Sequence, residues 1–149
     1  MSGRVRDVAD LERTASHEAA HVLVAVKLHW PFESATIDPE EGSNGHVSLR
    51  APENADQART VLAVFLAGVA FAGRYALPAE PDGPTDAQMA TRVWREFGLD
   101  VQDWADAYRT AERLLADNRR SHTMLASALV HYREIGERLA EQIVEYASS

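Results

Sequence analysis

The chain has 149 residues, of which 46% are apolar and 26% are charged, and this length and composition predict one globular domain. Fifteen basic and 23 acidic side chains give a formal net charge of −8, which excludes nucleic acid as a partner unless a local basic patch exists. The sequence contains no cysteine, so a disulfide framework, a thiolate metal site and a cysteine nucleophile are all excluded.

The first predicted element is a helix over about residues 8–28. Apolar residues recur three or four positions apart on one face of this segment: Leu11, Ala15, Ala19, Val22 and Val26. Asp7 or Asp10 could cap the start of the helix, and Trp30 and Pro31 end it.

A small sheet is predicted next, over about residues 34–50. Residues 34–38 and 46–50 have strand character, and the turn-rich segment 39–45 lies between them, which is typical of a β-hairpin or two short strands. A second helix over about residues 53–76 has an almost continuous apolar surface, so we expect it to be buried in the core.

The second half of the chain is predicted to be helical. Prolines and glycines over residues 78–84 form a connector, and Thr85 with Gln88 has the form of a capping box that begins a third helix at about residue 85. Further helices are predicted over about residues 100–147: one capped by Asp100, one capped by Ser121 and a last one over 135–146. The predicted fold class is therefore mainly α (α+β), with one small β-hairpin or sheet.

The sequence also indicates where in the cell the protein is located. The N-terminal residues lack the apolar core of a secretory signal, and the apolar run over residues 61–73 is shorter than the roughly 20 residues that span a bilayer. We therefore expect a cytoplasmic protein without a membrane partner. No P-loop sequence occurs, so we expect no ATPase activity within this chain.

The first predicted helix contains the sequence His17-Glu18-Ala19-Ala20-His21. Histidines four residues apart lie on one helical face, close enough for both imidazoles to bind one zinc ion. Glu18 emerges beside that ion, where its carboxylate could act as the general base on a water molecule. Composition alone can also produce such a spacing, but its location inside an amphipathic helix favours the metal-binding interpretation.

Two histidines leave a catalytic zinc site incomplete, because such a site commonly has three protein ligands. His29 lies two further turns along the predicted helix, too far to bind the same ion, and the segment over residues 61–76 contains no acid. The third ligand is therefore expected further downstream, at Asp86. Alternatively, Asp86 is an acid in the first turn of a helix that merely complements the helix dipole.

Several segments resemble the peptidase domain of the FtsH-type zinc metallopeptidases. Residues 15–25 resemble the zinc-binding helix of the form H-E-A-G-H, and residues 36–39 and 45–47 resemble the strand V-T-I-x-P and the segment G-[YF]-[TV]. Residues 66–68 resemble the L-x-G of the second helix, and residues 83–91 resemble G-x-x-N-D-[LI]-x-x-A-T. Residues 107–119 are similar to A-Y-x-x-A-x-x-[IL]-L-x-x-N-R, and the tail through Glu137 resembles the closing helix of the family.

This resemblance implies a helical, zincin-like peptidase domain over residues 1–149. It implies a zinc cofactor bound by His17, His21 and Asp86, with Glu18 as the catalytic base. The implied activity is that of a metalloendopeptidase that hydrolyses peptide bonds in peptides or unfolded protein segments. The edge of the small sheet, over residues 45–49, could hold such a substrate by β-augmentation.

The chain also departs from the family pattern. Ala20 replaces a glycine, Thr85 replaces an asparagine, and residues 68–73 lack the arginine and the acidic pair of the family's second helix. The family's ATPase module is not in this chain, so a separate ATPase or adaptor could supply substrate. These departures motivate an alternative function, a zinc-binding regulatory or interaction module with little or no hydrolytic activity.

The remaining candidates have structural interpretations. His46, His122 and His131 are expected to be surface or capping residues, although His46 and Tyr75 are candidates for stabilising an oxyanion. The apolar C-terminal helices could belong to the core or to the interface of a homo-oligomer, and the sequence does not separate these two interpretations.

Overall fold

The computed structural model describes residues 7–38, 45–80 and 85–148. Helices dominate these residues, and a three-stranded antiparallel sheet accompanies them, which confirms the predicted fold class. The elements in chain order are α1 (Val8–Lys27), β1 (Phe32–Thr36), β2 (His46–Leu49), α2 (Ala55–Phe71), α3 (Asp86–Glu96), α4 (Val101–Asp117), α5 (Arg119–Tyr132), β3 (Glu134–Gly136) and α6 (Glu137–Ser148).

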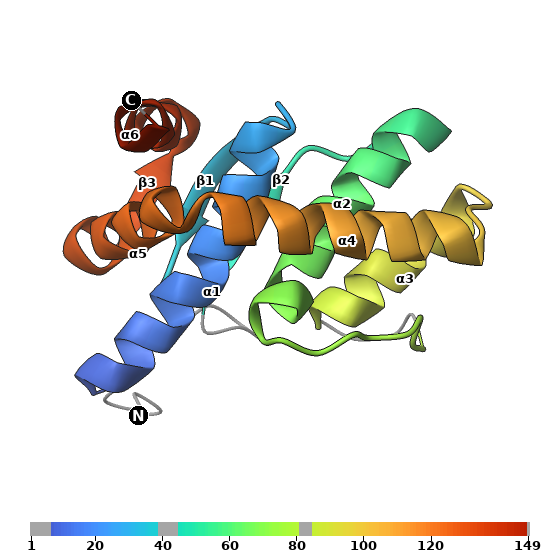
Figure 1. The fold of residues 1–149 in the computed structure, drawn as a ribbon, viewed down its shortest axis with the longest axis horizontal. Helices are drawn as coiled ribbons and strands as arrows, with labels where there is room; N and C mark the ends of the chain where they lie inside the picture. The colour runs from blue at the N-terminus through green and yellow to red at the C-terminus, as the bar shows by residue number, and fades with distance from the viewer. Residues whose placement is uncertain (1–6, 39–44, 81–84, 149) are drawn as a thin grey trace.

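Helix α1 lies at the centre of the fold. It packs against α5, α2, α4 and α6 and also contacts the sheet. Its second half is buried almost without interruption, from Glu18 to Ala25, so side chains on several of its faces meet protein and not solvent. Figure 1 shows α4 running across α1 and α2, which places the N-terminal helix between later elements.

The sheet has the strand order β2-β1-β3, with β1 in the middle. Strand β1 pairs with β2 in the register Ala35↔Val47 and Thr36↔His46, and with β3 in the register Ala35↔Ile135. Within the described residues, β2 and β3 are therefore the edge strands. The structure thus extends the predicted hairpin by a third strand.

Three of the predicted helix starts are confirmed by their capping contacts. Asp7 caps α1, where its side chain accepts a hydrogen bond from the Asp10 N–H at 2.8 Å. Thr85 and Gln88 form the expected capping box at the start of α3. Asp100 caps α4, with its side chain accepting from the Asp103 N–H at 2.8 Å. These side chains satisfy N–H groups that a helix leaves unpaired.

Other predicted boundaries are wrong. Helix α2 ends at Phe71 and not at residue 76, because Gly73 adopts a left-handed conformation with φ of +76° that ends the helix. Ser121 does not cap α5, which begins at Arg119, so that Ser121 is buried inside the helix with 2% of its surface exposed. His29 follows the end of α1 with φ of +58° and does not continue that helix.

The predicted last helix begins too early in the sequence. Residues 134–136 form β3, and α6 begins only at Glu137. Pairing with β1 supplies this strand with hydrogen-bond partners that local sequence does not reveal. Most of the predicted turn, residues 39–44, and most of the predicted connector, residues 81–84, lie outside the described residues.

Candidate metal centre

Helix α1 places the two histidines of its motif side by side. His17 and His21 are one turn apart, their ring centroids lie 5.0 Å apart, and their Nε2 atoms are separated by 3.3 Å. His21 is buried, with 4% of its surface exposed, whereas 38% of the His17 side chain is exposed. The histidine pair therefore extends from the core at His21 to the solvent-exposed surface at His17.

Asp86 lies at the first position of α3, and its carboxylate meets both histidines. Its Oδ2 atom is 2.7 Å from His17 Nε2 and 3.0 Å from His21 Nε2. Donors about 2.0–2.1 Å from one tetrahedral ion lie roughly 3.3 Å from each other. These three atoms are thus spaced almost as they would be around a single ion, and two imidazoles with one carboxylate form a donor set that suits zinc and other divalent metals.

Helix α2 contributes backbone to the centre. The Val64 carbonyl oxygen lies 2.7 Å from His21 Nδ1, so it accepts a hydrogen bond from that nitrogen and directs Nε2 toward Asp86. At Gly68, a Cβ atom would lie 2.5 Å from Asp86 Oδ2 and 2.8 Å from His17 Nε2. Only a residue without a side chain leaves this space open for the ligand atoms.

The charges of His21 and Asp86 depend on each other. Burial by itself would lower the pKa of the His21 imidazole, but the neighbouring Asp86 carboxylate reverses that effect and raises the pKa to about 9. Burial would likewise raise the pKa of Asp86, but the charges and hydrogen bonds of His21 and His17 hold it well below its usual range. Both pKa shifts favour a His21 imidazolium paired with an Asp86 carboxylate when no metal is bound.

Glu18 is buried beside this centre, with 7% of its surface exposed. Burial raises the pKa of its carboxyl group, while the nearby charges of His21, His17 and His46 act in the opposite direction. A raised pKa brings a carboxylate closer to the range in which it both takes up and returns a proton near neutral pH. The environment of Glu18 is therefore suited to general acid–base chemistry.

Thr91 holds the start of α3 to the preceding segment. It is fully buried, its hydroxyl donates to the Ala87 carbonyl at 2.7 Å, and it accepts a hydrogen bond from the Ala79 N–H at 2.9 Å. These contacts fix the chain on either side of Asp86. Apart from the position of Thr91 in the motif over residues 83–91, no pattern in the sequence indicates this role.

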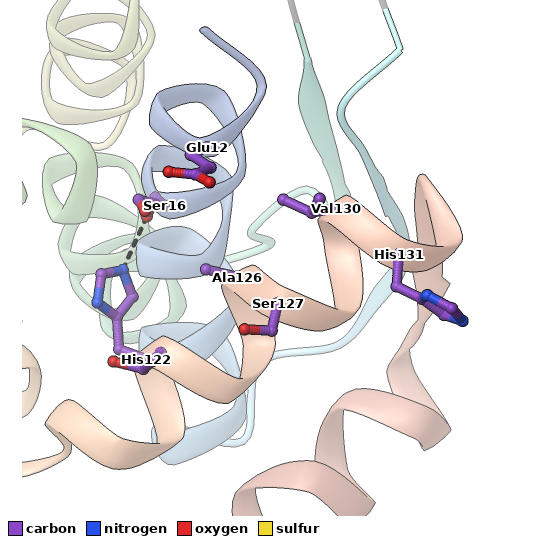
Figure 2. Close-up of a pocket in the computed structure, with 8 residues that line it drawn as sticks. Glu12, Ser16, His122, Ala126, Ser127, Val130 and His131 are labelled. Carbon is purple, nitrogen blue, oxygen red and sulfur yellow. Dashed lines mark hydrogen bonds between the residues drawn. The ribbon is translucent and has the colours of Figure 1, made fainter. Parts of the chain in front are cut away.

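The other candidates are not part of the three-residue cluster. His46 is half-buried on β2 and close enough to influence the charge of Glu18. Tyr75 is 49% exposed and packs its ring against Tyr108 with a centroid distance of 4.8 Å. Residues of α1 and α5 line a separate groove with a volume of about 520 Å³, in which His122 Nε2 bonds to the Ser16 carbonyl at 2.8 Å (Figure 2). His131 lies exposed at the end of α5.

Sequence reasoning missed the roles of Gly68 and of the Val64 carbonyl. The residue triplet 66–68 resembles a family motif, but the steric reason for its glycine appears only when α2 is packed against α1 and α3. The Val64 carbonyl belongs to the backbone, so no residue type signals it.

No known family model matches this chain, and no curated protein does so either. None of the helices in the described residues combines the length and apolar character that crossing a membrane requires.

Proposed function

We propose that this protein is a zinc-dependent metalloendopeptidase of the FtsH type. One observation carries the proposal: His17, His21 and Asp86 bring three ligand atoms within 4.8 Å of one another, and the buried Glu18 lies directly beside them. An ion-binding site with a structural role has no need of a buried carboxylate with a raised pKa at its side.

The residues of the centre have distinct roles in this proposal. His17, His21 and Asp86 would hold the zinc ion, and the Val64 carbonyl orients the His21 ring. Bound zinc lowers the pKa of water and polarises a peptide carbonyl. Glu18 takes the proton of the attacking water and passes it to the leaving amine, while its burial keeps bulk solvent away from this transfer.

The proposed substrates are peptides and unfolded protein segments in the cytoplasm. Strand β2 is an edge strand in the described part of the sheet, and α1 contacts it. An extended peptide could add to this edge through main-chain hydrogen bonds, whereas folded proteins do not present such a strand. A separate ATPase or adaptor would supply unfolded chains, and a homo-oligomer would be compatible with this scheme.

Glu18→Gln provides the test. We expect the wild type and this variant to bind about one zinc ion per chain, because no ligand is changed. Hydrolysis of an unstructured, fluorescently labelled protein should fall by roughly a hundredfold or more in the variant, since the general base is lost. Glu12→Gln is the matched control: it makes the same change on an exposed position of the same helix and should leave hydrolysis unchanged.

Other outcomes would separate the candidate functions. A zinc-bound wild type that cleaves neither unfolded proteins nor a peptide library would contradict the peptidase and favour a zinc-binding interaction module. A protein that takes up no zinc when the metal is supplied would contradict both functions. His17→Ala and Asp86→Ala should each abolish or strongly weaken zinc binding in the same assay.

A further inference from the structure

Helices α1 and α2 run antiparallel where they pass the candidate metal centre. The Val64 carbonyl contacts His21, and Gly68, one turn later in α2, faces His17, one turn earlier in α1. The next turn of α2 therefore passes beyond His17, level with the part of α1 that precedes it. Phe71 lies in that turn, three residues after Gly68. These pairings place Phe71 at the end of the centre where His17 is exposed.

A contact from α5 gives the same position for Phe71. The rings of Phe71 and His122 pack edge to face, with their centroids 4.9 Å apart. His122 Nε2 in turn donates a hydrogen bond to the Ser16 carbonyl oxygen at 2.8 Å, and Ser16 immediately precedes His17 in α1 (Figure 2). Two independent sets of contacts, one from Gly68 along α2 and one from Ser16 across α5, therefore connect His17 to the Phe71 ring.

The Phe71 ring is only partly covered by this packing. His122 contacts it from one side, and 42% of the surface of Phe71 remains exposed. The His17 side chain is also 38% exposed, so a peptide that reaches the candidate ligands comes from the same solvent-exposed side. Covering apolar surface with another apolar group is favourable, and aromatic rings gain further from an edge-to-face or offset contact. Phe71 therefore offers such a contact to a bound peptide.

We propose that Phe71 is a specificity-determining residue, whose ring packs against an aromatic or large aliphatic side chain of the peptide next to the scissile bond. This inference rests on the proposed peptidase function and names its substrate class: unfolded segments with a large apolar residue beside the cleaved bond. Such residues are mostly buried in folded proteins and become accessible on unfolding. His122 is a positioning residue in this arrangement, because its ring supports the Phe71 ring and its Nε2 is bonded to α1.

Phe71→Ala removes the ring and tests the preference without turnover. Two series of non-hydrolysable phosphinic peptides carry phenylalanine or glycine directly before or directly after the phosphinate group that replaces the scissile amide. In one series the zinc-loaded wild type should bind the phenylalanine peptide about tenfold more tightly than the glycine peptide. Phe71→Ala should reduce this ratio to about twofold or less, and Phe71→Leu, which keeps a large apolar side chain, should retain part of it.

Tyr132→Ala is the matched control. Tyr132 also ends a helix, α5, and its ring also packs edge to face against a histidine, His131, at a centroid distance of 4.6 Å. It is 59% exposed, and its end of α5 leads into β3 and not toward Asp86. Its ratio of affinities should equal that of the wild type. Zinc content should be the same in all of these proteins, because no candidate ligand is changed.

The failure of this inference can be distinguished from the failure of the proposed function. A wild type that prefers phenylalanine in neither series would overturn the assignment, as would a preference that Phe71→Ala retains in full. If that wild type still cleaves unfolded proteins, the peptidase stands. If the wild type cleaves nothing, the peptidase is wrong, and the phosphinic peptides still decide the role of Phe71. A preference lost in Phe71→Ala then supports the contact, and no binding to the wild type overturns it.

Discussion

Gly68 lies on α2 where a Cβ atom would come within 2.5 Å of both Asp86 Oδ2 and His17 Cε1. The atoms that it would meet are the ends of side chains and not backbone. Those side chains can swing away, so a methyl group at this position displaces the ligand atoms without blocking the packing of α2. The absence of a side chain at Gly68 therefore leaves the candidate ligand atoms of α1 and α3 in their observed positions.

Gly68→Ala should therefore separate metal binding from stability. We expect zinc affinity to fall by about tenfold to a hundredfold, as when groups that support a metal site are altered. The thermal stability of the metal-free protein should change little. Alanine in a helix interior is favoured over glycine by about 1 kcal/mol, and this gain offsets the cost of displacing the side chains of His17 and Asp86. Chelator competition measures the affinity, and thermal unfolding in EDTA measures the stability.

Gly136→Ala is the matched control for this change. A Cβ atom there would lie 3.7 Å from the Glu33 carbonyl oxygen, an ordinary van der Waals separation, and the position is remote from the ligands in the sequence. Its zinc affinity should equal that of the wild type. If Gly68→Ala binds zinc as tightly as the wild type, the prediction is wrong, and zinc binding does not depend on the absence of a side chain at residue 68.

The His21 ring should determine how the proposed metal binding depends on pH. Both of its nitrogens face oxygen acceptors, Val64 O at 2.7 Å and Asp86 Oδ2 at 3.0 Å, which favours the doubly protonated ring with its pKa near 9. A metal binds only the unprotonated Nε2, so zinc must displace a proton below pH 9. Between pH 6.5 and 8.5 the apparent zinc affinity should rise by about tenfold per pH unit.

Calorimetry in two buffers of different ionisation enthalpy measures the proton released on zinc binding. We expect about one proton per zinc at pH 7.5 from this group. An apparent affinity that stays constant from pH 6.5 to 8.5 would mean that His21 is already neutral in the metal-free protein. Asp86 does not add to the slope in this range, because its pKa is lowered and it is ionised throughout.

At the scale of elements, the start of α3 must be fixed if Asp86 is to meet α1. The capping box of Thr85 and Gln88 defines where the helix begins, and Thr91 ties its first turns to Ala79. Trp104 of α4 adds a further tether, because its indole N–H donates to the Ala76 carbonyl at 2.7 Å. The segment that leads to Asp86 is thereby held from both α3 and α4.

Thr91→Val tests this tether. The replacement has nearly the same shape but leaves the part-buried Ala79 N–H without its acceptor, which should lower the free energy of unfolding by about 1 kcal/mol. Thr60→Val is a suitable control, because the Thr60 hydroxyl also faces the carbonyl four residues earlier, at 3.5 Å, and its loss should cost less than about 0.5 kcal/mol. Equal losses in urea unfolding would show that the bond to Ala79 contributes nothing.

Local signals in the sequence predicted some elements and not others. The starts of α1, α3 and α4 were predicted correctly because Asp7, Thr85 and Asp100 act within their own first turns. Strand β3 was missed because three residues are too few to show alternation, and its partner β1 is distant in sequence. Contacts between residues distant in sequence leave no local signal either. The proximity of Asp86 to His17 and His21 was therefore expected only from a motif and its resemblance to a family. The contacts of Val64 and Gly68 became visible only in the packed structure.

At the scale of the whole molecule, the candidate centre lies where early and late parts of the chain meet. Helix α1 supplies two candidate ligands and the proposed base Glu18, α2 supplies the space at Gly68 and the Val64 carbonyl, and α3 supplies the Asp86 carboxylate. Later helices enclose this group, with α5 packed along α1 and α4 packed against α2 (Figure 1). The geometry of the centre is therefore a property of the packed helices and not of one motif.

Strand β3 pairs with β1 from near the opposite end of the chain. Synthesis proceeds from the N-terminus, so every proposed metal ligand leaves the ribosome well before the strand that completes the sheet. A growing chain thus carries His17, His21 and Asp86 while the edge strand that bears His46 still lacks its full support. If the proposed hydrolysis needs the complete sheet, it would begin only after residues 134–136 have been synthesised and paired with β1.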